Sequence, residues 1–191
     1  MGYIQTLKRI REGRTDYRKR KAILLGRHVF ATVRVSDENT MVQISKASMN
    51  GDVVLASAHS RELLKYGWKG SRRCLPACYL TGLLAGKKAK ANGVDGCIVY
   101  VGVRGFSSRI GASAKGLRDA GLDVPVGEDA LPDEDRITGK HIAEYAAMLK
   151  EEDEELYSKR FSAILARGLR PEDYVKHFNE VKDNIMKDSG D

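Results

Sequence analysis

The stretch VFATVRVSDENTMVQISKASMNGDVVLASA (29–58) decides the fold of this chain. Apolar and β-branched side chains fill three short runs, Val29–Val35, Met41–Lys46 and Val53–Ala58, and turn-forming residues separate the runs. The first separator is Ser-Asp-Glu-Asn (36–39), and the second carries an Asn-Gly pair, which favours tight hairpins. Three short strands joined in this way predict an antiparallel meander.

The chain before the meander is basic and has no apolar periodicity at its start. Residues 1–14 therefore predict an extended arm. Thr15 is a good N-cap, Asp16 suits the first turn of a helix, and Gly26 suits its end. Together they predict a short helix over Asp16–Leu25.

Two helices are predicted directly after the meander. Ser60–Tyr66 suits a short helix that Gly67 ends, and Pro76 suits the first turn of a longer helix that continues to about Asn92. The longer helix carries a leucine face and two glycines that allow close approach to a sheet: Leu80, Leu83, Leu84, Gly82 and Gly86.

A continuous apolar run, Gly96–Val103, then predicts a buried parallel strand. A loop over Gly102–Gly111 follows it, and a helix is expected over Ala112–Ala120, closed by Gly121. A meander followed by strand, helix, strand and helix predicts an α/β fold with a mixed sheet and a right-handed β-α-β crossover.

The remainder of the chain is predicted to be helical. The helices are expected over Asp133–Glu155, Leu156–Arg167 and Pro171–Lys187. Their apolar positions, such as Ile142 and Phe161, suit packing on the core or on another protein.

Charge is distributed unevenly along the chain. The formal net charge is +7, and the first 27 residues hold nine Lys or Arg against two acids. Residues 28–118 hold 14 basic and 5 acidic side chains, whereas residues 119–191 hold 10 basic and 19 acidic ones. A polyanion attracts the first two segments and repels the third, so nucleic acid is the first partner to consider. The arm is rich in Arg, which grips phosphate bidentately, and lacks the dense apolar face of an interfacial membrane helix.

These patterns divide the chain into three parts. They are an extended basic arm (1–14), an α/β RNA-binding core (15–126) and an acidic helical C-terminal extension (127–191). No apolar run approaches the roughly 18 residues of a membrane span, and no apolar signal core follows the charged N-terminus, so we expect a cytosolic protein.

The sequence carries no catalytic, metal or cofactor signature. The four histidines lack metal-ligand spacing, no G-x-S-x-G elbow occurs, and the Gly-rich loop 102–111 matches neither a P-loop nor the dinucleotide fingerprint. The strands are nearly free of the converging carboxylates that two-metal nucleases need. Three cysteines form neither a disulfide framework nor a zinc ribbon. We therefore expect no enzyme activity, no metal and no cofactor.

Five strings, in order, resemble one known family. They are EGRTDYRKRKAILL (12–25), LASAHSRELLKYGWKG (55–70), YLTGLLAGKKA (79–89), DAGLDVP (119–125) and LPDEDRITGKHIAEYA (131–146). They are similar to the archaeal and eukaryotic branch of large-subunit ribosomal protein eighteen, the family that binds 5S ribosomal RNA, and the resemblance runs from about Arg9 to near the C-terminus.

The resemblance implies a fold, a role and a location. The fold is the ribonuclease H-like variant found in translational machinery. The role is that of a structural constituent of the large subunit, which binds 5S rRNA and helps to attach it to large-subunit rRNA. The location is the central protuberance of the cytoplasmic ribosome, beside neighbouring ribosomal proteins.

This chain departs from the family pattern at two places near the first hairpin. The family usually has Pro-Arg where His28-Val29 stands, and a basic Ser-Asn-Lys-His turn where residues 36–39 are acidic. Arg34 and Ser36 keep their places. Charge and resemblance together assign RNA contacts to Arg9, Arg11, Arg14, Thr15, Tyr17, Arg18, Lys19, Arg20, Lys21, Arg34, Ser36, His59, Ser60, Lys87, Lys88, Arg104, Ser107 and Arg109.

Two other classes of protein are open on the sequence alone. One is a nucleic-acid-processing enzyme on the same fold, which a metal-dependent RNA cleavage assay would separate. The other is a protein-interaction module built on the acidic extension, whose binding would survive high salt and need no RNA.

Overall fold

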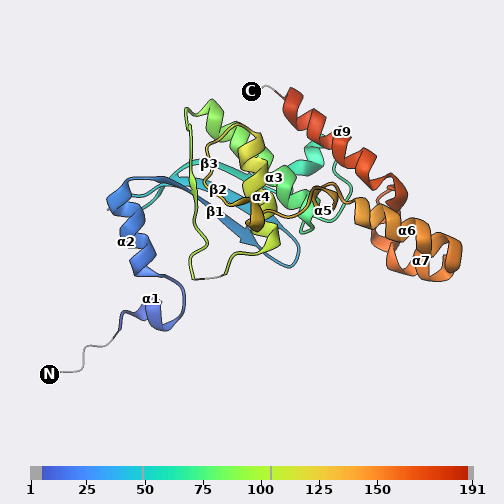
Figure 1. Ribbon diagram of the computed structural model, residues 1–191, viewed down its shortest axis with the longest axis horizontal. Helices are drawn as coiled ribbons and strands as arrows, with labels where there is room; N and C mark the ends of the chain where they lie inside the picture. Colours follow the sequence, from blue (N-terminus) through green and yellow to red (C-terminus); the bar gives the residue numbers. More distant parts are fainter. Residues whose placement is uncertain (1–5, 49, 104, 189–191) are drawn as a thin grey trace.

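The computed structural model describes residues 6–48, 50–103 and 105–188, and its centre is a four-stranded sheet in the order β3-β2-β1-β4 (Figure 1). β1 (Val29–Val35), β2 (Thr40–Lys46) and β3 (Val53–His59) form an antiparallel meander, and β4 (Ile98–Val99) lies parallel to β1. The predicted mixed sheet is confirmed, and the chain between β3 and β4 crosses from one edge of the sheet to the other.

β4 is much shorter than the strand predicted over Gly96–Val103. The apolar run divides between two neighbours, because Gly96 forms a parallel bridge with Asp123 whereas only Ile98–Val99 pairs with β1. Gly102 then adopts a left-handed conformation with φ +65°, which turns the chain away from the sheet. Apolar character alone therefore predicted a strand over Gly96–Val103, but only Ile98–Val99, in its middle, pairs with β1.

Helices α3 (Leu75–Ala91) and α4 (Ser108–Asp119) cover one face of the sheet. They pack closely on each other, because a Cβ on Gly82 would collide with the backbone of Ser113, and one on Gly116 with the backbone of Tyr79. The prediction that Gly82 and Gly86 serve an approach to the sheet is wrong, since both face α4 and its C-cap Ala120. α4 also begins at Ser108, four residues before the predicted start.

The N-terminal segment contains two helices. Where an extended arm was predicted, α1 (Lys8–Arg11) forms one helical turn, and α2 (Tyr17–Gly26) follows it. The N-cap of α2 is Asp16 rather than Thr15, because the Asp16 carboxylate accepts hydrogen bonds from the backbone N–H groups of Arg18 and Lys19.

The remaining elements are shorter than predicted. Gly139, with φ +81°, separates two helices where one was expected over Asp133–Glu155, and the expected α-helix over Ser60–Tyr66 is a 3₁₀ helix. Their bounds are η1 (Glu62–Tyr66), η2 (Glu128–Ala130), α5 (Glu134–Thr138), α6 (Lys140–Glu152), α7 (Glu154–Arg160), α8 (Ser162–Leu165), η3 (Pro171–Asp173) and α9 (Tyr174–Lys187).

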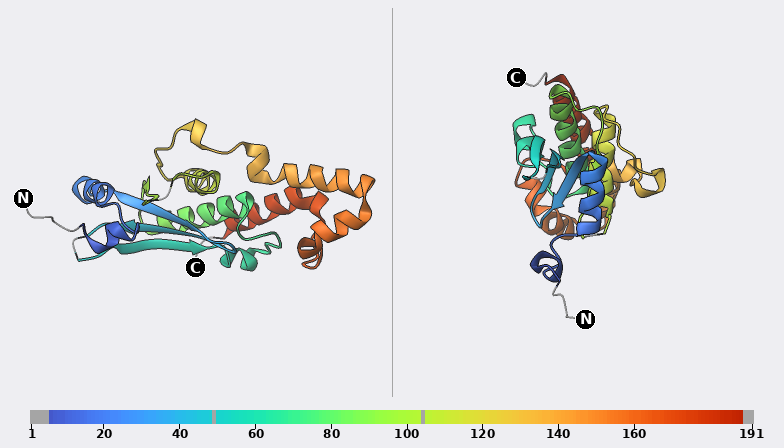
Figure 2. Two further views of the ribbon diagram at one scale, coloured as in Figure 1. Left: turned by 90° about the horizontal axis from the view of Figure 1, so that it is seen from below. Right: turned by 90° about the vertical axis from the view of Figure 1, so that its left-hand side faces the viewer.

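Helix α9 belongs to the main hydrophobic core. Tyr174, Phe178, Val181 and Ile185 are buried in the same cluster as Trp68 and the leucines of α3. A second, smaller cluster lies between α6, α7 and Phe161. In the left view of Figure 2 the packed centre lies between the α1–α2 segment at one end and the α6–α7 hairpin at the other. The hydrophobic core therefore extends across residue 127. The boundary between the core and the C-terminal extension remains a proposal that rests on the change of charge there.

Candidate nucleic-acid interface

The cations of the N-terminal segment are mostly exposed, and some are already paired. Arg9 Nε donates to the Thr15 hydroxyl at 2.9 Å, and Arg14 Nε lies 3.0 Å from a Glu12 carboxylate oxygen. These bonds close the turn between α1 and α2, so Thr15 has a structural partner and its hydroxyl accepts a bond within the chain. Arg11 is exposed in the same turn.

Helix α2 presents its four consecutive cations to different surroundings. Arg20 points inward, where its guanidinium pairs with Asp52 and lies 5.7 Å from the ring centre of Phe30. Lys19 Nζ donates to the carbonyl oxygen of Gly102 at 3.0 Å. Arg18 and Lys21 are exposed, and among the described residues neither side chain has a partner.

This arrangement follows from helical geometry. Successive residues are about 100° apart around a helix, so four adjacent cations cannot share one face. Ile23 is the buried residue of α2, and Arg20 lies on the same side of the helix, three residues earlier. Arg18 and Lys21 therefore form the cationic outer face of α2, and Tyr17, 38% exposed, begins the helix.

The face of the sheet opposite α3 is largely uncovered beyond α2. Arg34, Met41 and His59 are direct cross-strand partners on β1, β2 and β3, and they form one row on this face. The next row is Thr32, Gln43 and Ser57. We call these six residues the open face. Arg34 and Ser57 are exposed, and the other four are partly exposed.

A basic cluster that sequence reasoning missed lies at the end of the first row. The backbone N–H of Arg61 donates to His59 Nδ1 at 3.1 Å, and Arg72 is close enough to affect the same ring. Burial lowers the pKa of His59, and the positive charges of Arg61 and Arg72 lower it further, against an opposing effect of Glu62. His59 is therefore neutral at pH 7 in the free protein. Arg61 lies in LASAHSRELLKYGWKG (55–70), one of the five strings that resemble the family. That resemblance was the signal that could have identified Arg61.

Two predicted contacts near this cluster have structural roles. Ser60 is fully buried, and its hydroxyl accepts from the Thr40 backbone N–H at 3.0 Å, so its side chain is not accessible to RNA in this structure. Ser36 is exposed, but its hydroxyl donates to the Asn39 carbonyl and accepts from the Asn39 N–H, which closes the acidic turn.

Lys87 and Lys88 are also engaged inside the protein. Lys87 Nζ donates to the last carbonyl groups of α9, and Lys88 Nζ pairs with Glu62 and donates to the Ser57 carbonyl. Burial tends to raise the pKa of Glu62, but the bonds from Lys88 and the His59 N–H lower it overall. The structure thus gives both lysines partners within the protein.

The loop before α4 borders a hollow of about 290 Å³. Ser107 and Arg109 line it together with Ser36 and Asp37, and the side chains of Ser107 and Arg109 are exposed. Arg109 lies in the first turn of α4 rather than in a loop. Arg104 lies outside the described residues.

The same region has no catalytic or metal-binding arrangement. No three His, Cys, Asp or Glu side chains within the described ranges lie close enough to hold a metal ion. Burial raises the pKa of Cys78 to about 12 and that of Cys97 to about 11, so these thiols stay protonated.

No helix in the described part of the chain is long and apolar enough to cross a membrane.

Sequence comparisons agree with this picture. Residues 2–95 match the family model described as ribosomal large subunit proteins 60S L5 and 50S L18. The large ribosomal subunit protein uL18 of Thermofilum pendens is 51% identical over 185 residues, which cover 96% of this chain and 94% of that protein. The uL18 proteins of Ignicoccus hospitalis and Saccharolobus solfataricus are 48% and 44% identical, over 95% and 96% of this chain and 90% and 93% of theirs. The chain therefore belongs to this family of large-subunit ribosomal proteins, whose role is structural and not enzymatic.

Proposed function

We propose that this protein binds 5S ribosomal RNA and helps to attach it to the large-subunit rRNA. The observation that carries the proposal is the outer face of α2, where Arg18 and Lys21 have no partner within residues 6–48, 50–103 and 105–188 and lie beside an uncovered sheet face. Phosphates can approach both surfaces without displacing a packed element. The remaining candidates for contact are Arg9, Arg11, Arg14, Tyr17, Lys19, Arg34, His59, Ser107 and Arg109, to which we add Arg61 and Arg72.

The outer face of α2 and the open face of the sheet suit different parts of an RNA contact. Arginine and lysine on α2 suit phosphate binding, which supplies affinity but little sequence information. The open face offers Gln43 and Ser57, which can hydrogen-bond to riboses and base edges, and His59, which can take up a proton and bind a phosphate. We propose a ribonuclease H-like fold for this core, residence in the central protuberance of the cytoplasmic ribosome, and contacts with neighbouring ribosomal proteins there.

Binding of purified 5S rRNA tests this function. Filter binding or gel shift at two salt concentrations, with transfer RNA as competitor, measures specific affinity. We expect 5S rRNA to bind at least about 1,000-fold more tightly than transfer RNA. Equal affinity for both RNAs would contradict the proposal. Substitution of Arg18 and Lys21 by Gln must weaken binding if the outer face of α2 carries it.

A further inference from the structure

The outer surface of α6 carries two large apolar side chains that the described part of the chain leaves largely uncovered. Tyr145 is 44% exposed and Met148 is 47% exposed. With His141 and Glu152 they follow the spacing i, i+4, i+7 and i+11, which places them along one side of a helix. We call these four residues the α6 stripe.

The stripe lies on a well-packed scaffold. On the inner side of the hairpin Ala146, Leu149, Tyr157 and Phe161 form a buried cluster. Glu172 joins the two helices from outside, because it accepts hydrogen bonds from Lys150 at 2.9 Å and from the Tyr157 hydroxyl at 3.2 Å. The helix that carries the stripe is therefore held in place, and a partner would not have to order it on binding.

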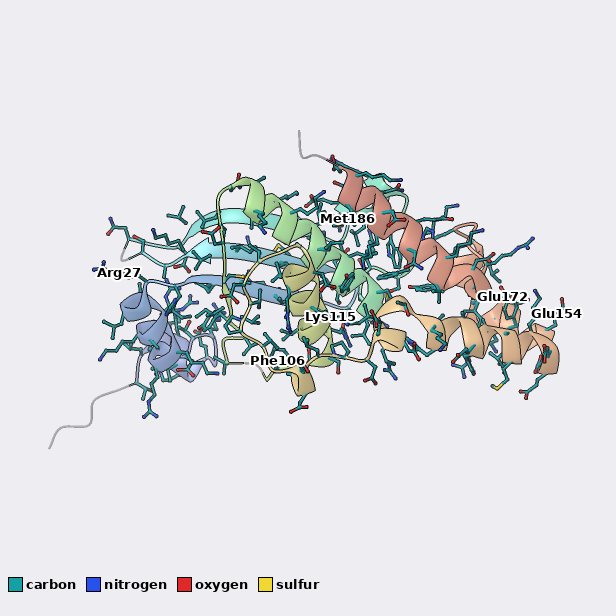
Figure 3. The ribbon with its side chains drawn as sticks, turned by 45° about the horizontal axis from the view of Figure 1, so that its top comes forward. Arg27, Phe106, Lys115, Glu154, Glu172 and Met186 are labelled. Atoms are coloured by element: carbon teal, nitrogen blue, oxygen red, sulfur yellow. The ribbon has the colours of Figure 1, made fainter. Side chains whose placement is uncertain are left out.

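Negative charge gathers at the C-terminal end of the stripe, over the end of α6 and the start of α7. Glu151, Glu152, Glu154 and Glu155 are exposed, and within the described ranges none of them forms an ion pair. Figure 3 places Glu154 and Arg27 at opposite ends of the molecule, so the acidic hairpin lies far from the basic α2 region. RNA is repelled by such a surface, whereas a basic polypeptide is attracted to it.

We infer that the α6 stripe docks a basic amphipathic segment of another protein. Apolar side chains of that segment cover Tyr145 and Met148, and its lysines or arginines pair with the glutamates at the end of the stripe. The inference rests on the proposed function, because RNA bound around α2 leaves the hairpin free to reach a neighbour in the assembly. A second copy of this chain is a poor partner. Its own α6 stripe carries the same negative charge, and its basic N-terminal arm is already occupied by RNA.

Peptide binding to the full-length protein tests the inference. The probe is a fluorescent synthetic helix of leucine and lysine, with leucine on one face, and anisotropy gives its Kd. Y145S/M148S is expected to weaken binding at least about tenfold, equivalent to about 1.4 kcal/mol. The matched control, L64S/M186S, removes two side chains that are 55% and 50% exposed elsewhere, and it is expected to leave the Kd within about twofold.

Each result has a defined reading once circular dichroism shows that both variants are folded. Equal affinity of wild type and Y145S/M148S would overturn the inference, as would equal binding of a lysine peptide in which serine replaces leucine. Self-association of the wild type that only Y145S/M148S abolishes, measured by sedimentation in the presence of 5S rRNA, would assign the stripe to a second copy instead. Y145S/M148S is expected to bind 5S rRNA like the wild type. Failure of the wild type to bind 5S rRNA would sink the proposed function and leave the peptide result standing.

Discussion

The Nζ atom of Lys87 lies 2.8 Å from the carbonyl oxygen of Ile185, 98 residues later in the chain. The same ammonium donates to the carbonyls of Met186 and Asp188, at 2.8 and 2.7 Å. A helix leaves its last carbonyl groups without intrahelical partners, and a cation is favourable at that end. Lys87 of α3 therefore caps α9 and fastens the last helix to the core.

Replacement of Lys87 by Met should destabilise the protein without weakening RNA binding. The change removes three charged hydrogen bonds, of which the one to Ile185 is partly buried, so we expect the free energy of unfolding to fall by about 1.5–3 kcal/mol. Urea denaturation measures this decrease. Lys90→Met is the matched control, because Lys90 is exposed on the same helix and donates only to the Gly121 carbonyl. A tenfold weakening of 5S rRNA affinity in folded K87M would return Lys87 to the RNA interface.

Lys87 and Lys88 show which contacts cannot be predicted from the sequence. Adjacent lysines on a helix look solvated, and only the fold brings Ile185 to Lys87 and Glu62 to Lys88. Burial of Ser60 was hidden for the same reason, because its hydroxyl bonds to the backbone of Thr40 across a hairpin. Such contacts depend on distant partners that periodicity does not reveal.

Local patterns predicted the meander and α3 well. The bounds of β1 were correct, and those of β2 and β3 differ by one residue, because alternating burial and turn residues fix a meander locally. α3 matched for a similar reason, since Pro76 and Gly93 flank a strongly apolar segment. β4 was overestimated, because an apolar run does not specify which neighbour each residue pairs with.

Arg18 and Lys21 should carry the salt dependence that α2 contributes to RNA binding. Removal of one cation from a phosphate lowers the salt slope by about 0.7–0.9 log units per log unit of salt, so R18Q/K21Q should lower it by about 1.4–1.8. Filter binding across a salt series measures the slope. Arg20→Gln is the control, because Arg20 is already paired with Asp52, and it should change the slope by less than about 0.9. An unchanged slope in folded R18Q/K21Q would remove α2 from the interface.

His59 should make RNA binding stronger as the pH falls from about 7.5 toward 5.5. Its pKa in the free protein is below the ordinary 6.5, chiefly through burial and then through Arg61 and Arg72. A bound phosphate favours the imidazolium, so binding takes up a proton and affinity gains up to about tenfold for each unit by which the phosphate raises the pKa. His59→Gln should abolish the gain, and His141→Gln should keep it.

The same depressed pKa has a consequence for stability. The unfolded chain binds the proton more readily than the folded one, so stability is fully present above about pH 6.5 and falls as the pH drops through the folded-state pKa. Folding must therefore be verified at each pH. Binding by the wild type that does not vary across this range would place His59 outside the RNA contact.

The two hydrophobic clusters should respond differently to removal of a ring. Phe178 is 2% exposed in the main core, so Phe178→Ala should lower the global free energy of unfolding by about 3–5 kcal/mol. Phe161 is buried in the hairpin cluster alone. Its replacement by Ala should lower amide protection in α6 and α7 and leave protection of β1 and α3 unchanged, because the hairpin can open locally. Hydrogen exchange with mass spectrometry measures both effects. An equal decrease in protection across the whole chain in F161A would show that the hairpin and the core unfold as one unit.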